Sequence, residues 1–203
     1  MYVRVAAAAL SISAAAGTAW IAAEGEGPQS ISNDGAVLLH PYVPTQGDVP
    51  TIGHGSTHYE DGTRVTLADP PITRQRAQQL ALGELDRTYA RCVRESLGSV
   101  LVNQVEFDKA VDFTGQYGCG AWRSSGMLRK TRAGDYPGAC RAYLSYKFLT
   151  SSRREGAGWV AYRWGKAGVP TRWRYDCSTP GNRVCSGVWL RQIGRYNDCM
   201  GAL

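Results

Sequence analysis

The N-terminal stretch from Val5 to Ala23 constrains this chain most, because it contains no charged side chain and follows a single charged residue, Arg4. Its 19 residues approach the roughly 20 apolar residues that a bilayer-spanning helix needs. Ten of the 19 are alanine, and alanine gains little free energy from lipid. The sequence therefore predicts an N-terminal hydrophobic helix that supports export and is held only weakly in a membrane.

Four interpretations of this stretch stay open. It can be a signal peptide cleaved after small residues such as Ala14-Ala15-Ala16 or Ala16-Gly17-Thr18-Ala19, a permanent anchor, an anchor that later leaves the bilayer, or a buried helix of a cytosolic domain. The first three place the rest of the chain outside the cytoplasm. We expect residues 1–23 to form the export segment and residues 24–203 to form the folded domain.

Six cysteines without a C-x-x-C pair favour disulfides in an oxidising compartment over zinc ligands. Cys177 and Cys185 are close enough to form a local pair, and Cys199 must then reach back to an earlier cysteine. A formal charge of +6 favours anionic partners, namely nucleic acid, anionic lipid or cell-wall polymer. A hydrophobic content of 43% over 203 residues excludes disorder, collagen and a multi-span membrane protein.

Residues 24–72 are rich in glycine, proline, aspartate and threonine and show no helical period. We predict a small hairpin lobe, with one strand at residues 51–55 and the return strand at residues 64–67. The dipeptide Asp61-Gly62 is typical of the tight turn between two such strands.

Residues 73–203 follow a helical period instead. Thr73 is a predicted N-cap for a helix that ends at Gly98. Asn103 and Glu106 have the spacing of a capping box, in which a cap and the third helical residue satisfy each other's backbone groups.

Two more helices are predicted, one that begins near Asp135 and buries Cys140, Tyr143, Leu144 and Phe148, and one that runs through Trp189 to Cys199. The predicted fold class is therefore α+β, with a β-hairpin lobe at residues 24–72 and a larger, mainly helical lobe at residues 73–203.

Several segments of the chain occur in an order that is typical of one known family. They are Glu24-Gly25 or Glu26-Gly27, then Tyr42, then Thr51-Ile52-Gly53-His54-Gly55, then residues 113–118 and 124–136. In this order the chain resembles the phage endolysins of the T4-lysozyme-like muramidase family, glycoside hydrolase family 24, which includes members exported by a signal-anchor-release segment.

The resemblance implies a lysozyme-like fold and a cofactor-free lysozyme that hydrolyses the bond between N-acetylmuramic acid and N-acetylglucosamine in peptidoglycan and lyses the host bacterium. Such chemistry needs a carboxylic acid that stays protonated and a second group on the opposite face of the sugar. The resemblance makes Glu24 the proton donor, with Glu26 as the alternate. Because Glu24 directly follows the apolar stretch, we expect it to be partly desolvated.

The groups that hold the attacking water are harder to assign. The family carries aspartate or cysteine six residues before its threonine, and this chain has Thr45 six residues before Thr51. Either Asp48 supplies the carboxylate through a reshaped turn, or Thr45 and Thr51 orient the water without one. We predict Thr51 and Asp48 as catalytic residues and Thr45 as an alternate.

Gln116, Tyr42 and Tyr117 are predicted to bind the glycan, on the same resemblance. We predict no metal site, because Gly55 and the strand-like sequence around His54 and His58 do not give the helical spacing of a zinc pair.

The expected partners are peptidoglycan and, through residues 1–23, the inner membrane. We expect the protein to be an antibacterial, monomeric enzyme that is exported to the host periplasm. While the anchor is in the bilayer, Glu24 would lie against lipid and the cleft would be incomplete. The arginines between Arg153 and Arg174 form a predicted basic face towards the cell wall. Three rivals stay open: a non-catalytic cell-wall-binding protein, an amidase or lytic transglycosylase, and a nucleic-acid-binding protein, which leaves the cysteines unexplained.

Overall fold

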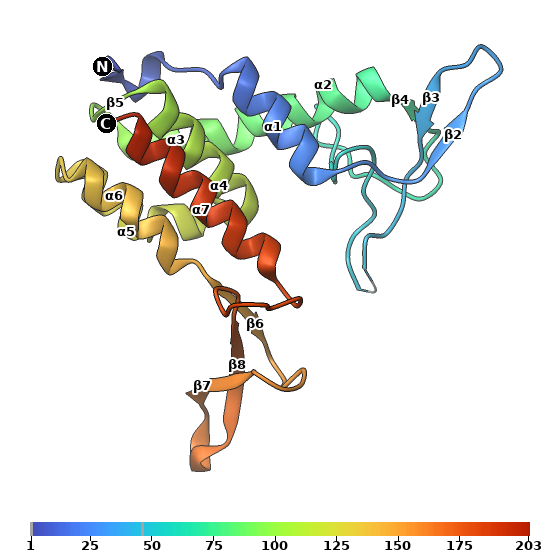
Figure 1. Ribbon diagram of the computed structural model, residues 1–203. Coiled ribbons are helices and arrows are strands. Elements are labelled where there is room, and N and C mark those ends of the chain that lie inside the picture. The colour runs from blue at the N-terminus through green and yellow to red at the C-terminus, as the bar shows by residue number, and fades with distance from the viewer. Residues whose placement is uncertain (1, 46) are drawn as a thin grey trace. The chain divides into compact units, whose positions relative to one another are not determined.

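The computed structural model describes residues 2–45 and 47–203, which divide into two compact units (Figure 1). Val3–Arg123 form the N-terminal unit, and Ser124–Leu203 belong to the C-terminal unit. Both units combine helices with small antiparallel sheets, so the predicted α+β class is confirmed.

The N-terminal unit is mainly helical. Its helical segments are η1 (Ala7–Ala9, a 3-10 turn), α1 (Ala14–Glu24), α2 (Arg74–Glu84), η2 (Leu85–Ala90, π-helical), α3 (Arg91–Leu97) and α4 (Gln104–Arg123). Its strands are β1 (Val5–Ala6), which pairs with β5 (Leu101–Val102), and β2 (Gln29–Ile31), β3 (Val37–Leu39) and β4 (Ile72–Thr73), which form one sheet.

The uncharged N-terminal stretch is not one helix, and the structure does not show the predicted N-terminal hydrophobic helix over its whole length. Arg4 forms an ion pair of 2.6 Å with Glu106, and strand β1 follows it. Helix α1 begins only after Ser13, whose hydroxyl caps the Ala16 amide and donates to Asp108. These polar contacts fix the start of the regular helix halfway along the stretch. Among the residues described, no helix has both the length and the apolar character of a membrane span.

The predicted helix ends of the N-terminal unit are confirmed. Thr73 accepts a hydrogen bond of 3.2 Å from the Arg76 amide and so caps α2. Asn103 and Glu106 satisfy each other's backbone amides at 2.9 and 2.8 Å, which is the predicted capping box of α4. Gly98 ends α3 with φ of 60°.

The β lobe differs from its prediction. Residues 51–55 and 64–67 do not form strands but make isolated bridges, Ile52 with Ser56 and His58 with Arg64. Gly53 and Gly55 have φ of 63° and 85°, and such left-handed residues bend the chain out of an extended strand. The regular hairpin lies earlier, where β2 pairs with β3 across residues 29–39.

The C-terminal unit holds the helices α5 (Gly126–Arg132), α6 (Tyr136–Ala142) and α7 (Ser186–Gly201), the 3-10 turns η3 (Tyr143–Ser145) and η4 (Lys166–Gly168), and the strands β6 (Phe148–Ser151), β7 (Val160–Trp164) and β8 (Pro170–Asp176). The strands form an antiparallel sheet in the order β6-β8-β7. This sheet was not predicted, and Phe148 begins β6 rather than continuing a helix. The predicted start of a helix near Asp135 is confirmed, because Asp135 caps α6 and accepts a hydrogen bond from the Gly138 amide at 2.8 Å.

Each unit contains disulfide bonds between its own cysteines. Cys92 is bonded to Cys119 in the N-terminal unit. In the C-terminal unit Cys177 is bonded to Cys185, as predicted, and Cys199 reaches back to Cys140.

Candidate active site

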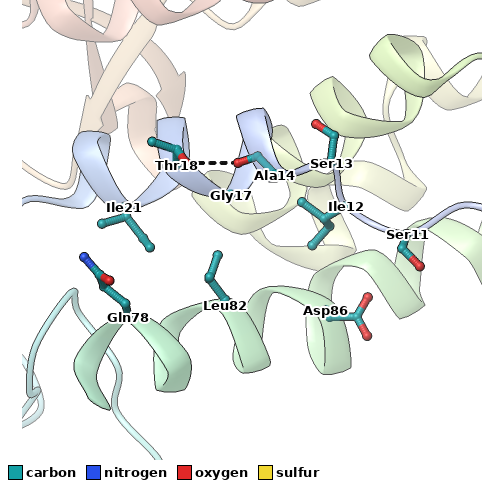
Figure 2. Close-up of a pocket in the computed structure, with 10 residues that line it drawn as sticks. All are labelled: Ser11, Ile12, Ser13, Ala14, Gly17, Thr18, Ile21, Gln78, Leu82 and Asp86. Carbon is teal, nitrogen blue, oxygen red and sulfur yellow. Dashed lines mark hydrogen bonds between the residues drawn. The ribbon is translucent and has the colours of Figure 1, made fainter. Parts of the chain in front are cut away.

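Two hollows of the N-terminal unit differ in their chemistry. The larger one, about 490 Å³, lies between α1 and α2, and Figure 2 shows Ile12, Ile21 and Leu82 among its lining residues. Asp86 is its one carboxylate, and Arg94 binds that carboxylate at 3.1 Å. An apolar hollow with one neutralised acid does not offer a pair of groups for acid–base chemistry.

The smaller hollow, about 190 Å³, gathers the ionisable groups. Its lining residues come from α1, from the loop after residue 53, from α2 and η2, and from α4. They are Trp20, Glu24, His54, Gly55, Ser56, Ala81, Glu84, Tyr89 and Gly115. Two carboxyl groups, an imidazole and two hydroxyl groups therefore meet in one small pocket, which we take as the candidate active site.

Glu24 is the last residue of α1 and lines this pocket. The turn that follows it is held by the β lobe: the ring Nδ1 of His54 lies 2.5 Å from the Gly25 carbonyl, and the Gly27 amide donates to the Gly53 carbonyl at 3.1 Å. Glu24 is exposed, so its expected partial desolvation is wrong. The helix ends at this residue, which leaves the side chain at the edge of the pocket.

His54 has a defined role in this arrangement. A carbonyl oxygen only accepts hydrogen bonds, so Nδ1 must carry the proton in the contact with Gly25. In the neutral ring Nε2 is then an acceptor. This Nε2 and the hydroxyl of Ser56 are buried and have no hydrogen-bond partner among the residues described. Buried polar atoms are almost always bonded, so both atoms are available to a ligand hydroxyl group or to water.

Glu84 is the second carboxyl group of the pocket. Burial raises the pKa of Glu84, and the positive charges of His58 and Arg87 offset only part of that effect. Burial also raises the pKa of Tyr89, with further contributions from the charges of Glu84 and Glu24. Because the charges of Glu24 and Glu84 both raise the pKa of Tyr89, the two carboxyl groups both lie close enough to interact with its phenol.

Glu84 is not among the site residues predicted from the sequence, although the sequence carries a signal for it. Ala77, Leu80, Ala81 and Leu85 are all buried, and Glu84 falls among them at helical spacing. An acid within the apolar stripe of an amphipathic helix is held at the core side rather than in open solvent. Such a position favours the protonated form of a carboxyl group.

Trp20 forms one wall of the pocket and fixes the approach of α1 to α4. Its indole is 8% exposed and lies 6.2 Å from the ring of Tyr89. A Cβ atom added to Gly115 would lie 2.2 Å from the indole Cη2 atom. Only glycine therefore leaves room for the indole at this place in α4.

The other predicted catalytic residues do not line the pocket. Thr51 is buried, and its Oγ1 lies 3.5 Å from the Tyr42 carbonyl. Asp48 accepts a hydrogen bond from the Thr45 hydroxyl, within an exposed turn. Glu26 forms an ion pair of 2.7 Å with Arg74, so its carboxylate is already engaged.

The predicted glycan-binding residues are not among the residues that line the pocket. The ring of Tyr42 covers Gly27, where an added Cβ atom would approach it to 2.5 Å. Tyr117 stacks on Phe113 at 4.8 Å, and Gln116 is half-buried beside it on α4. Within residues 113–118, Gly115 lines the pocket. No group of three or more potential metal ligands occurs in residues 2–45 and 47–203.

Comparisons with known proteins agree on one fold. The model of the phage lysozyme family matches residues 34–163, a range that starts after Glu24 and includes Glu84. No curated protein matches the chain.

Solved structures similar to the chain include an endolysin from Escherichia coli O157:H7 phage FAHEc1, with a TM-score of 0.65, 19% identity and coverage of 96% of both chains. The P22 lysozyme is similar with a TM-score of 0.58, 20% identity and coverage of 94% of this chain and 99% of its own. The muramidase domain of SpmX from Asticaccaulis excentricus has a TM-score of 0.56 at 18% identity, over 94% and 97% of the two chains. At these identities the structures establish the lysozyme-like fold.

Proposed function

The chain belongs to the phage lysozyme family, and on that premise we propose that it is a muramidase, which hydrolyses the β-1,4 bond between N-acetylmuramic acid and N-acetylglucosamine and lyses the host cell. One observation carries the proposal: Glu24 and Glu84 line one pocket together with the unpartnered His54 Nε2 and Ser56 Oγ. Glycoside hydrolysis requires a pair of carboxyl groups or their equivalent beside the scissile bond.

We assign the proton donor to Glu24. It is the carboxyl group at the edge of the pocket, where a polymeric glycan has access, and a bound sugar would cover it. Removing water from a carboxylate favours its protonated form, so substrate binding itself would prepare Glu24 to protonate the leaving oxygen.

Glu84 would act from deeper in the pocket. Because burial keeps a proton on this carboxyl group to higher pH, it can donate a hydrogen bond where an ionised group cannot. Thr51, with Asp48 or Thr45, stays our prediction for the group that orients the attacking water, and Gln116, Tyr42 and Tyr117 stay predictions for glycan binding.

The test is product analysis on purified peptidoglycan with the wild type and with Glu24→Gln, Glu84→Gln and Glu26→Gln. We expect new reducing ends from the wild type, a loss of at least about 100-fold with Glu24→Gln, and near-normal rates with Glu26→Gln. The Glu26 variant is a matched control, because it makes the same chemical change two residues away on a carboxylate that pairs with Arg74.

Other products would redirect the assignment. Loss of activity in Glu26→Gln but not in Glu24→Gln would move the proton donor to Glu26. New free amines would indicate an amidase, anhydromuramic ends a lytic transglycosylase, and binding without any product a non-catalytic cell-wall protein.

We propose further that residues 1–23 direct export to the host periplasm and hold the enzyme transiently at the inner membrane. The uncharged, alanine-rich composition of the stretch supports this proposal. N-terminal sequencing of the periplasmic protein is the test: a full-length chain supports a released anchor, and cleavage before Glu24 contradicts it.

A further inference from the structure

The excess positive charge of the chain is concentrated in the sheet of the C-terminal unit. Residues 147–176 contain seven lysines and arginines and two acidic residues, which gives +5, whereas the whole chain carries +6. A charge of this density on a sheet of β6, β7 and β8 is not explained by catalysis in the pocket of the other unit.

Only two of these cations are neutralised by carboxylates. Lys147 binds Asp176 at 2.7 Å, and Arg153 binds Glu155 at 2.9 Å. For the other five no ion pair with a carboxylate occurs within the described part of the chain. They are Arg154, Arg163, Lys166, Arg172 and Arg174.

The strand register brings several of these cations together. Arg163 on β7 lies directly opposite Arg172 on β8, and like charges in opposite positions of a sheet lower its stability. Arg174 follows Arg172 on the same face of β8, since side chains alternate along a strand. Its guanidinium lies 4.4 Å from the ring centroid of Phe148 and 5.6 Å from that of Tyr162, which hold it in place.

Exposed apolar side chains lie beside these cations. Val160 pairs with Arg174 and therefore belongs to the face of Arg172. Trp164 directly follows Arg163, beyond a register shift at the end of β7. Val160 is 61% exposed and Trp164 is 58% exposed. We call Val160, Arg163, Arg172 and Arg174, together with Trp164 at the end of β7, the cationic face.

We propose that the cationic face docks on an anionic phospholipid bilayer. Arginine forms strong, paired hydrogen bonds to phosphate, and an anionic surface attracts each basic side chain near it. Tryptophan prefers the headgroup level of a membrane, and an exposed valine gains from the apolar phase below it. Peptidoglycan offers carboxylates to the arginines but no apolar phase for Val160 or Trp164, so the combination favours lipid.

The experiment is co-sedimentation of the full chain with vesicles of phosphatidylcholine alone and of phosphatidylcholine with phosphatidylglycerol. We expect stronger binding to the anionic vesicles than to phosphatidylcholine alone, and we expect salt to weaken this difference. Arg172→Gln with Arg174→Gln should weaken it about 30-fold, because each basic group near an anionic surface contributes about a factor of five. The matched control, Arg129→Gln with Arg183→Gln, removes the same charge from exposed positions of the same unit and should leave binding within about twofold.

Residues 1–23 are present in every variant, so the differences report on the sheet alone. Trp164→Ser should weaken the binding that remains at high salt, where attraction between charges is screened. Circular dichroism of each variant checks that the sheet is folded. Equal binding by the two double variants, or retention on insoluble peptidoglycan instead of vesicles, would overturn the proposal.

Discussion

Replacement of Gly115 by alanine tests how the pocket is built. A new Cβ atom at this position would lie 2.2 and 2.5 Å from two carbon atoms of the Trp20 indole. These distances are far below van der Waals contact, and the indole is 8% exposed, so it can move only by displacing its neighbours. Overpacking of this kind costs about 1–3 kcal/mol.

The replacement also has a favourable part, because alanine stabilises a helix by about 1 kcal/mol relative to glycine. Gly120→Ala isolates that part. Gly120 lies in α4 beyond the kink at Gly118, where φ is 82° and ψ is 160°, and an added Cβ atom there meets nothing within 4 Å. The free energies of unfolding of the two variants should therefore differ by the overpacking cost, about 1–3 kcal/mol, with Gly120→Ala the more stable.

Urea denaturation of the wild type and both variants measures this difference, and hydrolysis of peptidoglycan gives its catalytic consequence. Trp20 lies one helical turn before Glu24 on α1, so a displaced indole also displaces the proposed proton donor. A misplacement of about 1 Å can cost about 100-fold in rate, and we expect kcat to fall in Gly115→Ala alone. Equal stability and equal rates of the two variants would refute the packing of Trp20 against α4.

Two further predictions concern stability. Burial raises the pKa of Glu84, so the contribution of Glu84 to stability is present at acidic pH and is lost as the pH rises through this raised pKa. Glu84→Gln should therefore stabilise the protein near pH 7 and not near pH 4. Urea denaturation at both pH values measures the effect. The disulfide of Cys140 and Cys199 spans 59 residues and that of Cys177 and Cys185 spans 8. If disulfides stabilise by reducing the entropy of the unfolded chain, replacing the first pair by alanine should lower the free energy of unfolding by about 4 kcal/mol and replacing the second pair by about 2.5 kcal/mol. Equal losses of stability in thermal unfolding would contradict this entropic explanation.

The sequence predicts best what is decided within a few residues. The caps at Thr73, Asn103 and Asp135 each bond a backbone amide three residues ahead, so residue type and spacing suffice. The pair of Cys177 and Cys185 is local in the same sense. The pairing of Cys92 with Cys119 was one of many possibilities until the fold brought the two residues together.

The predictions that were wrong have a common physical cause, because contacts between residues far apart in the sequence determine the structure at those positions. Residues 51–55 alternate like a strand, but Gly53 adopts a positive φ and packs against α2, where an added Cβ atom would lie 2.6 Å from that of Ala77. No residue of β6, β7 or β8 is buried, so these strands present no core-facing apolar stripe for a pattern to reveal. Among the candidate site residues, Glu24 does line the pocket, whereas Glu84 and His54 became candidates only when packing showed what surrounds them.

The π-helical segment Leu85–Ala90 has a geometric consequence for the pocket. In an α-helix with 3.6 residues per turn, two residues five apart point about 140° away from each other. The π-helical turn takes one more residue, with the Arg91 amide bonded to the Asp86 carbonyl, so residues five apart come nearly above one another. Glu84 and Tyr89 are five apart and line the same pocket. In an unbroken α-helix the phenol and the carboxyl group would face different sides, so the π-helical segment is what turns both of them towards one pocket.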